Sequence, residues 1–238
     1  MKIVEKTKNI ANILLWTVVL VLLANAVRLR IAGVCLIPTD SMENAIMAGD
    51  RIMVGKVRRG AIGRNDVIIF SHLDGSGVQL VKRCVGLPGD TVALREGIVY
   101  VNGEAIVVPP TVKASPSDHV SDFPLRSLGW TINNYGPVVA PAKGLSVLLD
   151  SVNVNLYRHV IGMEKVGDIQ YSDTLIEHYT FKTDGYFVLG DHRNNSLDSR
   201  YWGFVPEDSI IGKALLVCFS RDVNQKRIRW ERVGKIIH

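Results

Sequence analysis

Cysteine is scarce in this chain of 238 residues, and several familiar catalytic patterns are missing. The three cysteines, Cys35, Cys84 and Cys218, cannot all pair, and none has the close spacing of a metal site or a redox motif. Neither Ser41 nor any of the six histidines lies in a G-x-S-x-G catalytic elbow. No internal repeat or extended low-complexity tract is present. We therefore expect the cysteines to be small buried apolar residues, and we expect neither a metal nor a cofactor.

Charge is not spread evenly along the chain either. The formal net charge is +5, but the basic residues gather near the two ends and in the stretch 56–59. This distribution favours contact with a membrane surface over a nucleic-acid groove. We expect no nucleic acid among the partners.

The N-terminal segment indicates a location. Residues 9–27 carry no charge and, as a helix, would extend roughly 28 Å, close to the thickness of a bilayer's hydrocarbon core. We predict one transmembrane helix at 9–28. More basic groups precede it than follow it, so we expect residues 1–8 in the cytoplasm and the remainder on the periplasmic or extracytoplasmic side of the cell membrane. A cleaved signal peptide ending at Ala24-Asn25-Ala26 is the competing interpretation.

Beyond residue 34 the sequence is typical of a mainly β protein. Short β-branched runs are broken by Gly, Pro, Asn and Asp, which favours antiparallel strands. We predict a catalytic core built on an antiparallel, barrel-like β-sheet. Its strands are expected at 51–57, 66–70, 78–86, 91–94, 97–103, 184–190 and 209–219, with a tight hairpin at Arg95-Glu96-Gly97.

Residues 104–183 differ in texture and are expected to form an inserted α+β cap subdomain. The start of this part is rich in Pro and Ser, and the apolar residues of 146–162 follow a helical period. The predicted core therefore comprises 29–103 and 184–222, and a basic C-terminal tail follows at 223–238. This tail is either an amphipathic segment on a membrane interface or a solvated tail with one apolar face on the core.

Ser41 is a candidate nucleophile that needs a base. It lies in PTDSMENAIMAGD, residues 38–50, where MENAIMAG is expected to form a short helix with Asp40 as its N-cap. Lys82 is one candidate base, because its strand is rich in apolar residues and desolvation lowers the pKa of a lysine. From the local pattern alone, an exposed strand residue is the commoner interpretation of Lys82 and of Arg83.

Three motifs together resemble a known family. PTDSMENAIMAGD, VKRCVGLPGD and GDHRNNSLDSRYWGFVP occur in this order after an apolar N-terminal segment, as in the bacterial type I signal peptidases, the Ser/Lys leader peptidases of peptidase family S26. The resemblance covers the chain outside 104–183. It implies a membrane-anchored serine endopeptidase that removes N-terminal signal peptides from exported preproteins after an A-x-A type site.

The resemblance implies catalytic roles for three matched residues. Ser41 would be the nucleophile. Lys82 would be the general base that activates it and later protonates the leaving amine. The hydroxyl of Thr39 and the backbone N–H of Ser41 would form the oxyanion hole.

Support for the lysine is implied in the same way. Ser196 matches a serine that hydrogen-bonds and orients the lysine, while Asp198 and Arg200 match a pair that braces the site. Asp198 has to form an ion pair with Arg200, because a free carboxylate beside Lys82 would raise the pKa of the amine and stop it acting as a base.

The chain departs from the family's pattern at a few positions. Asp40 stands where a glycine is common, which brings an acidic group close to the oxyanion site. His192 and Asn194 replace the more frequent Asn and Asp on the loop before Ser196. We do not expect His192 to take a direct catalytic part.

The resemblance also predicts how substrate binds. Leu36, Ile37, Ile46 and Val81 match positions that line pockets for small residues at P1 and P3, so a signal peptide should bind as an added extended strand. The expected partners are signal peptides of secreted preproteins and the lipid bilayer, with the secretion translocon as a further candidate. The 14 residues from Val27 to Ser41 span at most about 48 Å, which keeps the site near the bilayer.

Two other functions are open at this point. A processing peptidase of narrower specificity would use the same Ser/Lys dyad; its self-cleaving form would need a scissile bond ahead of the serine, and Ala32-Gly33 lies only eight residues before Ser41. A non-catalytic membrane-anchored β-domain that binds peptides would not need Ser41, Lys82 and Ser196, which are all present.

Overall fold

The chain folds into antiparallel sheets with few helices. In this computed structural model the described residues are 12, 15–22, 25, 31–58, 60–73, 76–113, 128–150, 153–164 and 177–238. The predicted cytoplasmic residues 1–8 and half of the predicted transmembrane helix at 9–28 lie outside them. Residues 15–22 are helical, but none of the helices within the described ranges is long and apolar enough to span a bilayer.

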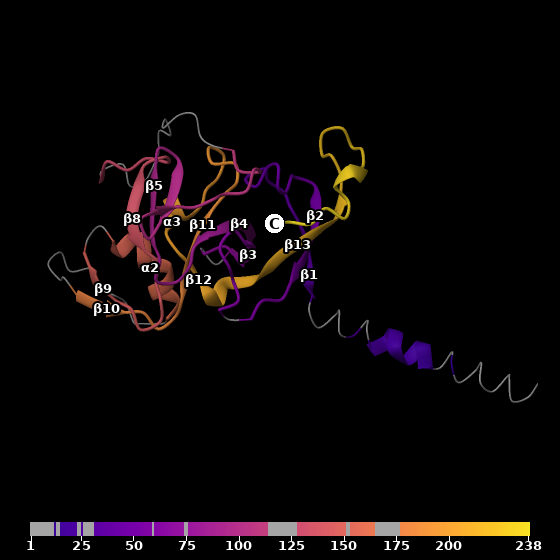
Figure 1. The fold of residues 1–238 in the computed structure, drawn as a ribbon, viewed down its shortest axis with the longest axis horizontal. Coiled ribbons are helices and arrows are strands. Elements are labelled where there is room, and N and C mark those ends of the chain that lie inside the picture. Colours follow the sequence, from indigo (N-terminus) through magenta and orange to yellow (C-terminus); the bar gives the residue numbers. More distant parts are fainter. Residues whose placement is uncertain are drawn as a thin grey trace, which may run out of the picture.

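A seven-stranded antiparallel sheet carries the middle of the molecule (Figure 1). Its order is β1-β2-β13-β3-β4-β11-β12, which leaves β1 and β12 as edge strands of an open sheet. β3 and β4 are central and most of their side chains are buried on both faces, which explains the continuous apolar run of β3 and the burial of the charged residues of β4. The strands are β1 (Ile31–Leu36), β2 (Asp50–Gly55), β3 (Val67–Ser71), β4 (Gln79–Gly86), β11 (Gly185–Leu189), β12 (Val205–Pro206) and β13 (Ile210–Ser220).

A second group of elements lies beside this sheet in Figure 1. A four-stranded sheet has the order β7-β6-β5-β8, and a two-stranded sheet pairs β10 with β9. Helix α2 (Val154–Met163) buries its apolar side in an aromatic core that includes Tyr157, Phe181, Phe187 and Phe204. The strands are β5 (Thr91–Arg95), β6 (Ile98–Val101), β7 (Glu104–Ala105), β8 (Tyr135–Val139), β9 (Ser146–Leu149) and β10 (Glu177–Thr180).

The remaining elements are short. Helix α3 (Ser199–Trp202) follows the loop that carries Ser196, and Asp198 caps it by accepting a hydrogen bond from the backbone N–H of Arg200. Two turns of 3-10 helix, η2 (Glu207–Ser209) and η3 (Trp230–Arg232), flank β13 in the sequence. η3 and the residues after it lie against β13 of the main sheet.

The predicted strands are confirmed, and all seven lie within two residues of the expected ends. The hairpin at Arg95-Glu96-Gly97 joins β5 to β6, with φ of 50° at Glu96 and 79° at Gly97. Two successive positive φ angles are the mark of the tight hairpin turn whose twist matches the flanking strands.

The helix predicted at 146–162 is partly wrong. Residues 146–149 form strand β9, which pairs with β10, and the helix begins only at Val154. The side chains of Asp150 and Asn153 each accept a hydrogen bond from the other residue's backbone N–H, which closes a turn between strand and helix. Side chains of this type compete with helical hydrogen bonds, and periodicity alone does not register that competition.

The boundary predicted between residues 103 and 104 falls inside a hairpin. Val101 on β6 pairs with Glu104 on β7, and β5 pairs with β8. The second sheet therefore takes strands both from the predicted core and from the predicted insert.

The C-terminal tail packs on the main sheet through buried arginines. Arg232 contacts Asp50, Arg229 contacts Ser220, and Ile237 lies in the core. Trp230 and Ile236 stay largely exposed. The packing interpretation is thus confirmed for the buried face, while membrane contact of the exposed face stays a prediction.

Candidate active site

Ser41 lies on the loop that joins β1 to β2. The loop is closed at its base, where Ile37 N donates to Asp50 O at 2.9 Å and Gly49 N donates to Ile37 O at 2.8 Å. The short helix predicted after Ser41 is wrong, because residues 41–46 form turns and Asn44 has a φ of 77°. A left-handed residue at this position breaks a helix after a single turn.

Two carboxylates hold the loop in place of a helix. Asp40 Oδ1 accepts a hydrogen bond from Ala48 N at 3.0 Å, and Asp50 Oδ2 accepts one from Met47 N at 2.9 Å. Asp40 therefore does bind a backbone N–H, as an N-cap would, but the donor lies eight residues away across the loop. The arrangement fixes the ends of the segment that carries Ser41.

Lys82 meets Ser41 at hydrogen-bonding distance. Its Nζ lies 2.7 Å from Ser41 Oγ, although the residues are 41 positions apart. Lys82 and Arg83 are only 3% and 1% exposed, so the interpretation of both as exposed strand residues is wrong. They are buried because β4 lies between β3 and β11, where Lys82 pairs with Ile68 and Arg83 with Leu189.

The surroundings of Lys82 disfavour its charged form. Burial is the largest effect and, together with the charge of Arg200, it outweighs the carboxylates of Asp198 and Asp191 and lowers the pKa of Lys82 to about 8. A substantial fraction of neutral amine is therefore present near neutral pH. Such an amine can accept the proton of a serine hydroxyl.

Asp198 and Arg200 form a fully buried ion pair behind the lysine. Arg200 donates from Nε to Asp198 Oδ1 and from Nη2 to Asp198 Oδ2, both at 2.8 Å. Burial alone would raise the pKa of Asp198, but Arg200 and the N–H of Gly190 hold that pKa below its usual value. The remaining donors of Arg200 bind the carbonyl oxygens of Ile132 and Arg193.

A second buried pair, Arg83 with Asp191, was not among the predicted site residues. Arg83 Nε and Nη2 donate to the two carboxylate oxygens of Asp191 at 2.7 Å, and Arg83 Nη1 reaches the carbonyl oxygens of Asn65 and His238. The available signal was an arginine beside Lys82 in a strand expected to be buried, because such a guanidinium requires a carboxylate. The pair ties β4 to the loop that leads to Ser196.

Ser196 lies at the same cavity as Ser41 and Lys82. Its Oγ is buried and forms no hydrogen bond with any of the residues that the structure describes. Gly190 lies directly beneath it, and a side chain there would collide with Ser196 and would stand 2.7 Å from the carbonyl oxygen of Ser41. The close approach of these three residues explains why position 190 holds a glycine.

His192 contacts the loop that carries Ser41. Its backbone N–H donates to Ser41 O at 3.1 Å, and its Nδ1 lies 3.0 Å from Glu43 Oε2, which also pairs with Lys113. Asn194, in contrast, lines the cavity at the dyad. His192 thus contacts the loop and not the Lys82 amine.

Two cavities adjoin the dyad. A small one of about 80 Å³ is lined by Leu36, Ile37 and Val81 together with Thr39 and both dyad residues. A larger one of about 380 Å³ also contains Thr39 and the dyad but extends toward the loop of Ser196. Ile46 is fully buried in the core beside Ile37 and Val81 and does not line the small cavity.

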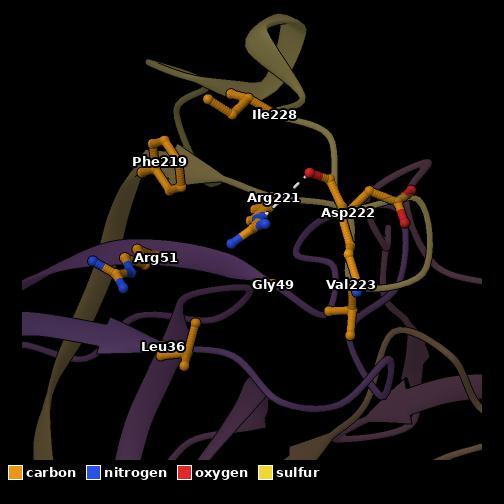
Figure 2. A pocket seen from close by; sticks show the side chains of 9 residues that line it. Leu36, Gly49, Arg51, Phe219, Arg221, Asp222, Val223 and Ile228 are labelled. Carbon is orange, nitrogen blue, oxygen red and sulfur yellow. Dashed lines mark hydrogen bonds between the residues drawn. The ribbon is translucent and has the colours of Figure 1, made fainter.

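A third cavity, of about 650 Å³, is lined by neither Ser41 nor Lys82. Figure 2 shows Leu36 and Arg51 on the strand side and Arg221, Asp222, Val223 and Ile228 on the opposing loop. Leu36 is shared with the small cavity at the dyad, while Ser41 and Lys82 do not take part. Within the described ranges, no group of three or more His, Cys, Asp or Glu side chains is placed to hold a metal ion.

The chain is similar to known signal peptidases. The family described as "Signal peptidase, peptidase S26" matches residues 10–219. A signal peptidase I of Buchnera aphidicola subsp. Baizongia pistaciae is 26% identical, with 99% of this chain and 86% of that protein covered. A signal peptidase I of Pseudomonas aeruginosa is 32% identical, with 77% and 63% covered. A crystal structure of a signal peptidase I from Enterococcus faecalis V583 is 24% identical over 64% of this chain and 95% of that one, with a TM-score of 0.31.

Proposed function

The chain belongs to the signal peptidase family, peptidase S26, and on this premise we propose that it cleaves signal peptides from exported preproteins after an A-x-A type site, with Ser41 as nucleophile and Lys82 as general base. As a member of this family it is a serine peptidase and hence a hydrolase. The observation that carries the proposal is the 2.7 Å contact between Ser41 Oγ and a lysine amine that is almost completely buried.

Acylation follows from this contact. In the neutral form of Lys82, the Ser41 hydroxyl donates its proton to Nζ while Oγ attacks the carbonyl carbon of the scissile bond. The tetrahedral intermediate collapses when the resulting ammonium protonates the departing amine. An acyl-enzyme on Ser41 remains, and a water molecule that Lys82 deprotonates hydrolyses it.

The developing oxyanion would be stabilised by the Thr39 hydroxyl and the Ser41 backbone N–H. Thr39 lines both cavities at the dyad, which supports its access to a bound carbonyl. Ser196 would hydrogen-bond the amine and orient it. Its buried Oγ, which lacks a partner among the described residues, supports that assignment because a buried hydroxyl needs one.

Selection of small residues is proposed to occur in the cavity of about 80 Å³. Leu36, Ile37 and Val81 supply apolar walls, and a space of this size admits a methyl group more readily than a large side chain. Ile46 would act indirectly, by packing behind Ile37 and Val81. The signal peptide would lie extended between the end of β1 and the start of β4.

The proposed location is the cell membrane, with a single anchor at 9–28, residues 1–8 in the cytoplasm and the catalytic part outside. The uncharged run of residues 9–27 supports it. The family match beginning at residue 10 includes most of this run. Lipid is then a partner, and the secretion translocon is a candidate partner.

The test is cleavage of a preprotein with an A-x-A site by the full chain in detergent micelles, with the product mass identifying the bond. Ser41→Ala and Lys82→Ala should each lose at least about 1,000-fold in kcat, as expected when a nucleophile or its base is removed. Lys143→Ala, an exposed lysine, serves as the control. Undiminished cleavage by either dyad variant would refute the mechanism, and a wild type that binds the peptide without cleaving it would favour a binding module.

A further inference from the structure

Two cavities meet at the dyad, and they differ in size and in lining. Ser41, Lys82, Thr39 and Leu80 line both of them. The small cavity lies between the end of β1 and the start of β4. The larger one opens in another direction, toward residues 194–197 and helix α3.

An extended polypeptide that crosses the dyad must place residues on both sides of the scissile bond. Under the proposed function, on which this inference rests, the residues before the bond occupy the small cavity. The residues after the bond then lie in the larger cavity. Lys82 lines that cavity, as it must in order to protonate the amine that departs on this side.

The lining of the larger cavity suits a short peptide segment. Its volume of about 380 Å³ is in the range of sites that bind small ligands. Tyr201 and Trp202 of α3 and the largely exposed Leu197 provide apolar surface, and Asn194 and Asn195 provide amide groups for a peptide backbone. Further polar groups come from His72 and Asp40.

Asp40 carries the distinctive charge of this lining. Its side chain is exposed, and Oδ1 accepts a hydrogen bond from Ala48 N, but no Lys, Arg or His of the described residues forms an ion pair with it. The other acidic residues of the loop are neutralised, Glu43 by Lys113 and Asp50 by Arg232. Asp40 is also not among the groups that act on Lys82. The Asp40 carboxylate is therefore available to pair with a cationic group that binds in the larger cavity.

We propose that the larger cavity binds the first residues of the released polypeptide, and that Asp40 makes it favour a basic side chain there. With a volume of about 380 Å³ the cavity has room for a short segment only, which we take to be the residues P1′ to P3′ directly after the bond. The site would thus select preproteins by the start of their mature part, in addition to the small residues before the bond.

The experiment compares preproteins that differ only at P2′, with Lys, Gln or Glu, and measures kcat/KM with the full chain in neutral detergent micelles. Lysine should exceed glutamate by about fivefold at low salt, as expected for one exposed charge pair, and less at high salt. Asp40→Asn keeps an oxygen for the Ala48 N–H and removes only the charge, so the ratio of Lys to Glu should fall to about one. Glu104→Gln, an exposed acidic residue on β7, should keep the wild-type ratio.

Each outcome bears on a separate statement. If wild type cleaves the three preproteins equally well, or if Asp40→Asn keeps the preference, the inference is overturned while the proposed function stands. A preference of the same size at P8′, beyond the reach of the cavity, would also overturn it by pointing to attraction from the whole surface. Failure to cleave even the Gln preprotein would instead overturn the proposed function.

Discussion

Asp198 and Arg200 stand two residues apart and form a two-point ion pair, 0% exposed, directly behind the Lys82 amine. The positive charge of Arg200 offsets much of the effect that the Asp198 carboxylate would otherwise have on the pKa of Lys82. Both residues influence the pKa of Lys82, in opposite directions. The Asp198 carboxylate can therefore lie near the Lys82 amine while the pKa of Lys82 stays lowered.

Removal of Arg200 should therefore change the titration of Lys82. In Arg200→Met the unmatched Asp198 carboxylate raises the pKa of Lys82, and the acid limb of kcat/KM against pH should move up by about one unit or more. The free energy of unfolding, measured in urea, should be about 3–5 kcal/mol lower than in wild type, because the buried Asp198 carboxylate loses its partner. Arg200→Lys, which keeps the charge, should leave the acid limb close to that of wild type. An unchanged limb in the methionine variant would contradict this role.

Lys82 should lower the stability of the fold at neutral pH. Its pKa falls from 10.5 in the unfolded chain to about 8 on folding, so the unfolded chain binds more protons between these values. The cost is fully present below pH 8 and disappears as pH rises past 10.5. Lys82→Met should then be more stable by about 3 kcal/mol at pH 7, with a smaller difference at pH 10. Equal urea midpoints of the two proteins at pH 7 would count against a desolvated lysine.

Gly190 should be intolerant of even a methyl group. In Gly190→Ala the added carbon would press on Ser196 and stand 2.7 Å from the carbonyl oxygen of Ser41, so Ser41, the proposed nucleophile, has to shift. A displacement of about 1 Å at a catalytic group lowers kcat by about 100-fold. Gly162→Ala, in helix α2 with open space around it, is the matched control and should keep full activity. Comparable activity of the two variants would mean that the loop relaxes without affecting Ser41.

The C-terminal tail should stabilise the nucleophile loop through Arg232 and Asp50. Arg232 donates to Asp50 at 2.6 Å and to the carbonyl oxygen of Ala45 at 3.1 Å. Arg232→Ala leaves the buried Asp50 carboxylate with only the more distant Arg229, at 3.6 Å, as a cationic partner, and should cost up to about 3–5 kcal/mol. Adding Asp50→Asn removes that charge and should restore part of the loss, which a double-mutant cycle in urea would measure. Strictly additive effects would show that the two side chains do not act as a pair.

The strands could be predicted from local sequence because the burial of their side chains leaves a recognisable pattern of apolar residues. In β3, which lies inside the sheet, four of the five residues are buried, and the sequence shows a continuous apolar run. The β5–β6 hairpin was predictable from Gly97. Sheet membership was not predictable, because the pairing of β5 with β8 depends on contacts across about 40 residues.

Both helix errors come from short polar side chains that bind the backbone. At 146–162 the period of the apolar residues suited a helix, but Asp150 and Asn153 close a turn in its middle. After Ser41, the positive φ of Asn44 and the carboxylates of Asp40 and Asp50 produce a loop. Apolar periodicity does not register such hydrogen bonds between side chains and the nearby backbone.

The sequence motifs identified the residues that lie together in the site. The contacts that hold these residues in place are seen only in the structure. Ser41, Lys82 and Ser196 were recognisable by type and spacing and lie around one cavity. The pair of Arg83 with Asp191, 108 positions apart, was not recognisable, since the partner of a buried arginine is fixed only by the register of β4 and β11. The hydrogen bond from the backbone N–H of Ala48 to Asp40 was not predictable either, because it depends on the shape of the loop between β1 and β2.

The most direct test of the central claim, that Lys82 acts as the base of Ser41, is kcat/KM of A-x-A preprotein cleavage from pH 5 to pH 10. Since the pKa of Lys82 is lowered to about 8, the rate should rise about tenfold per pH unit on the acid side and level off above pH 8. A rate at pH 5 close to that at pH 8, with an intact fold at both, would contradict a lysine base.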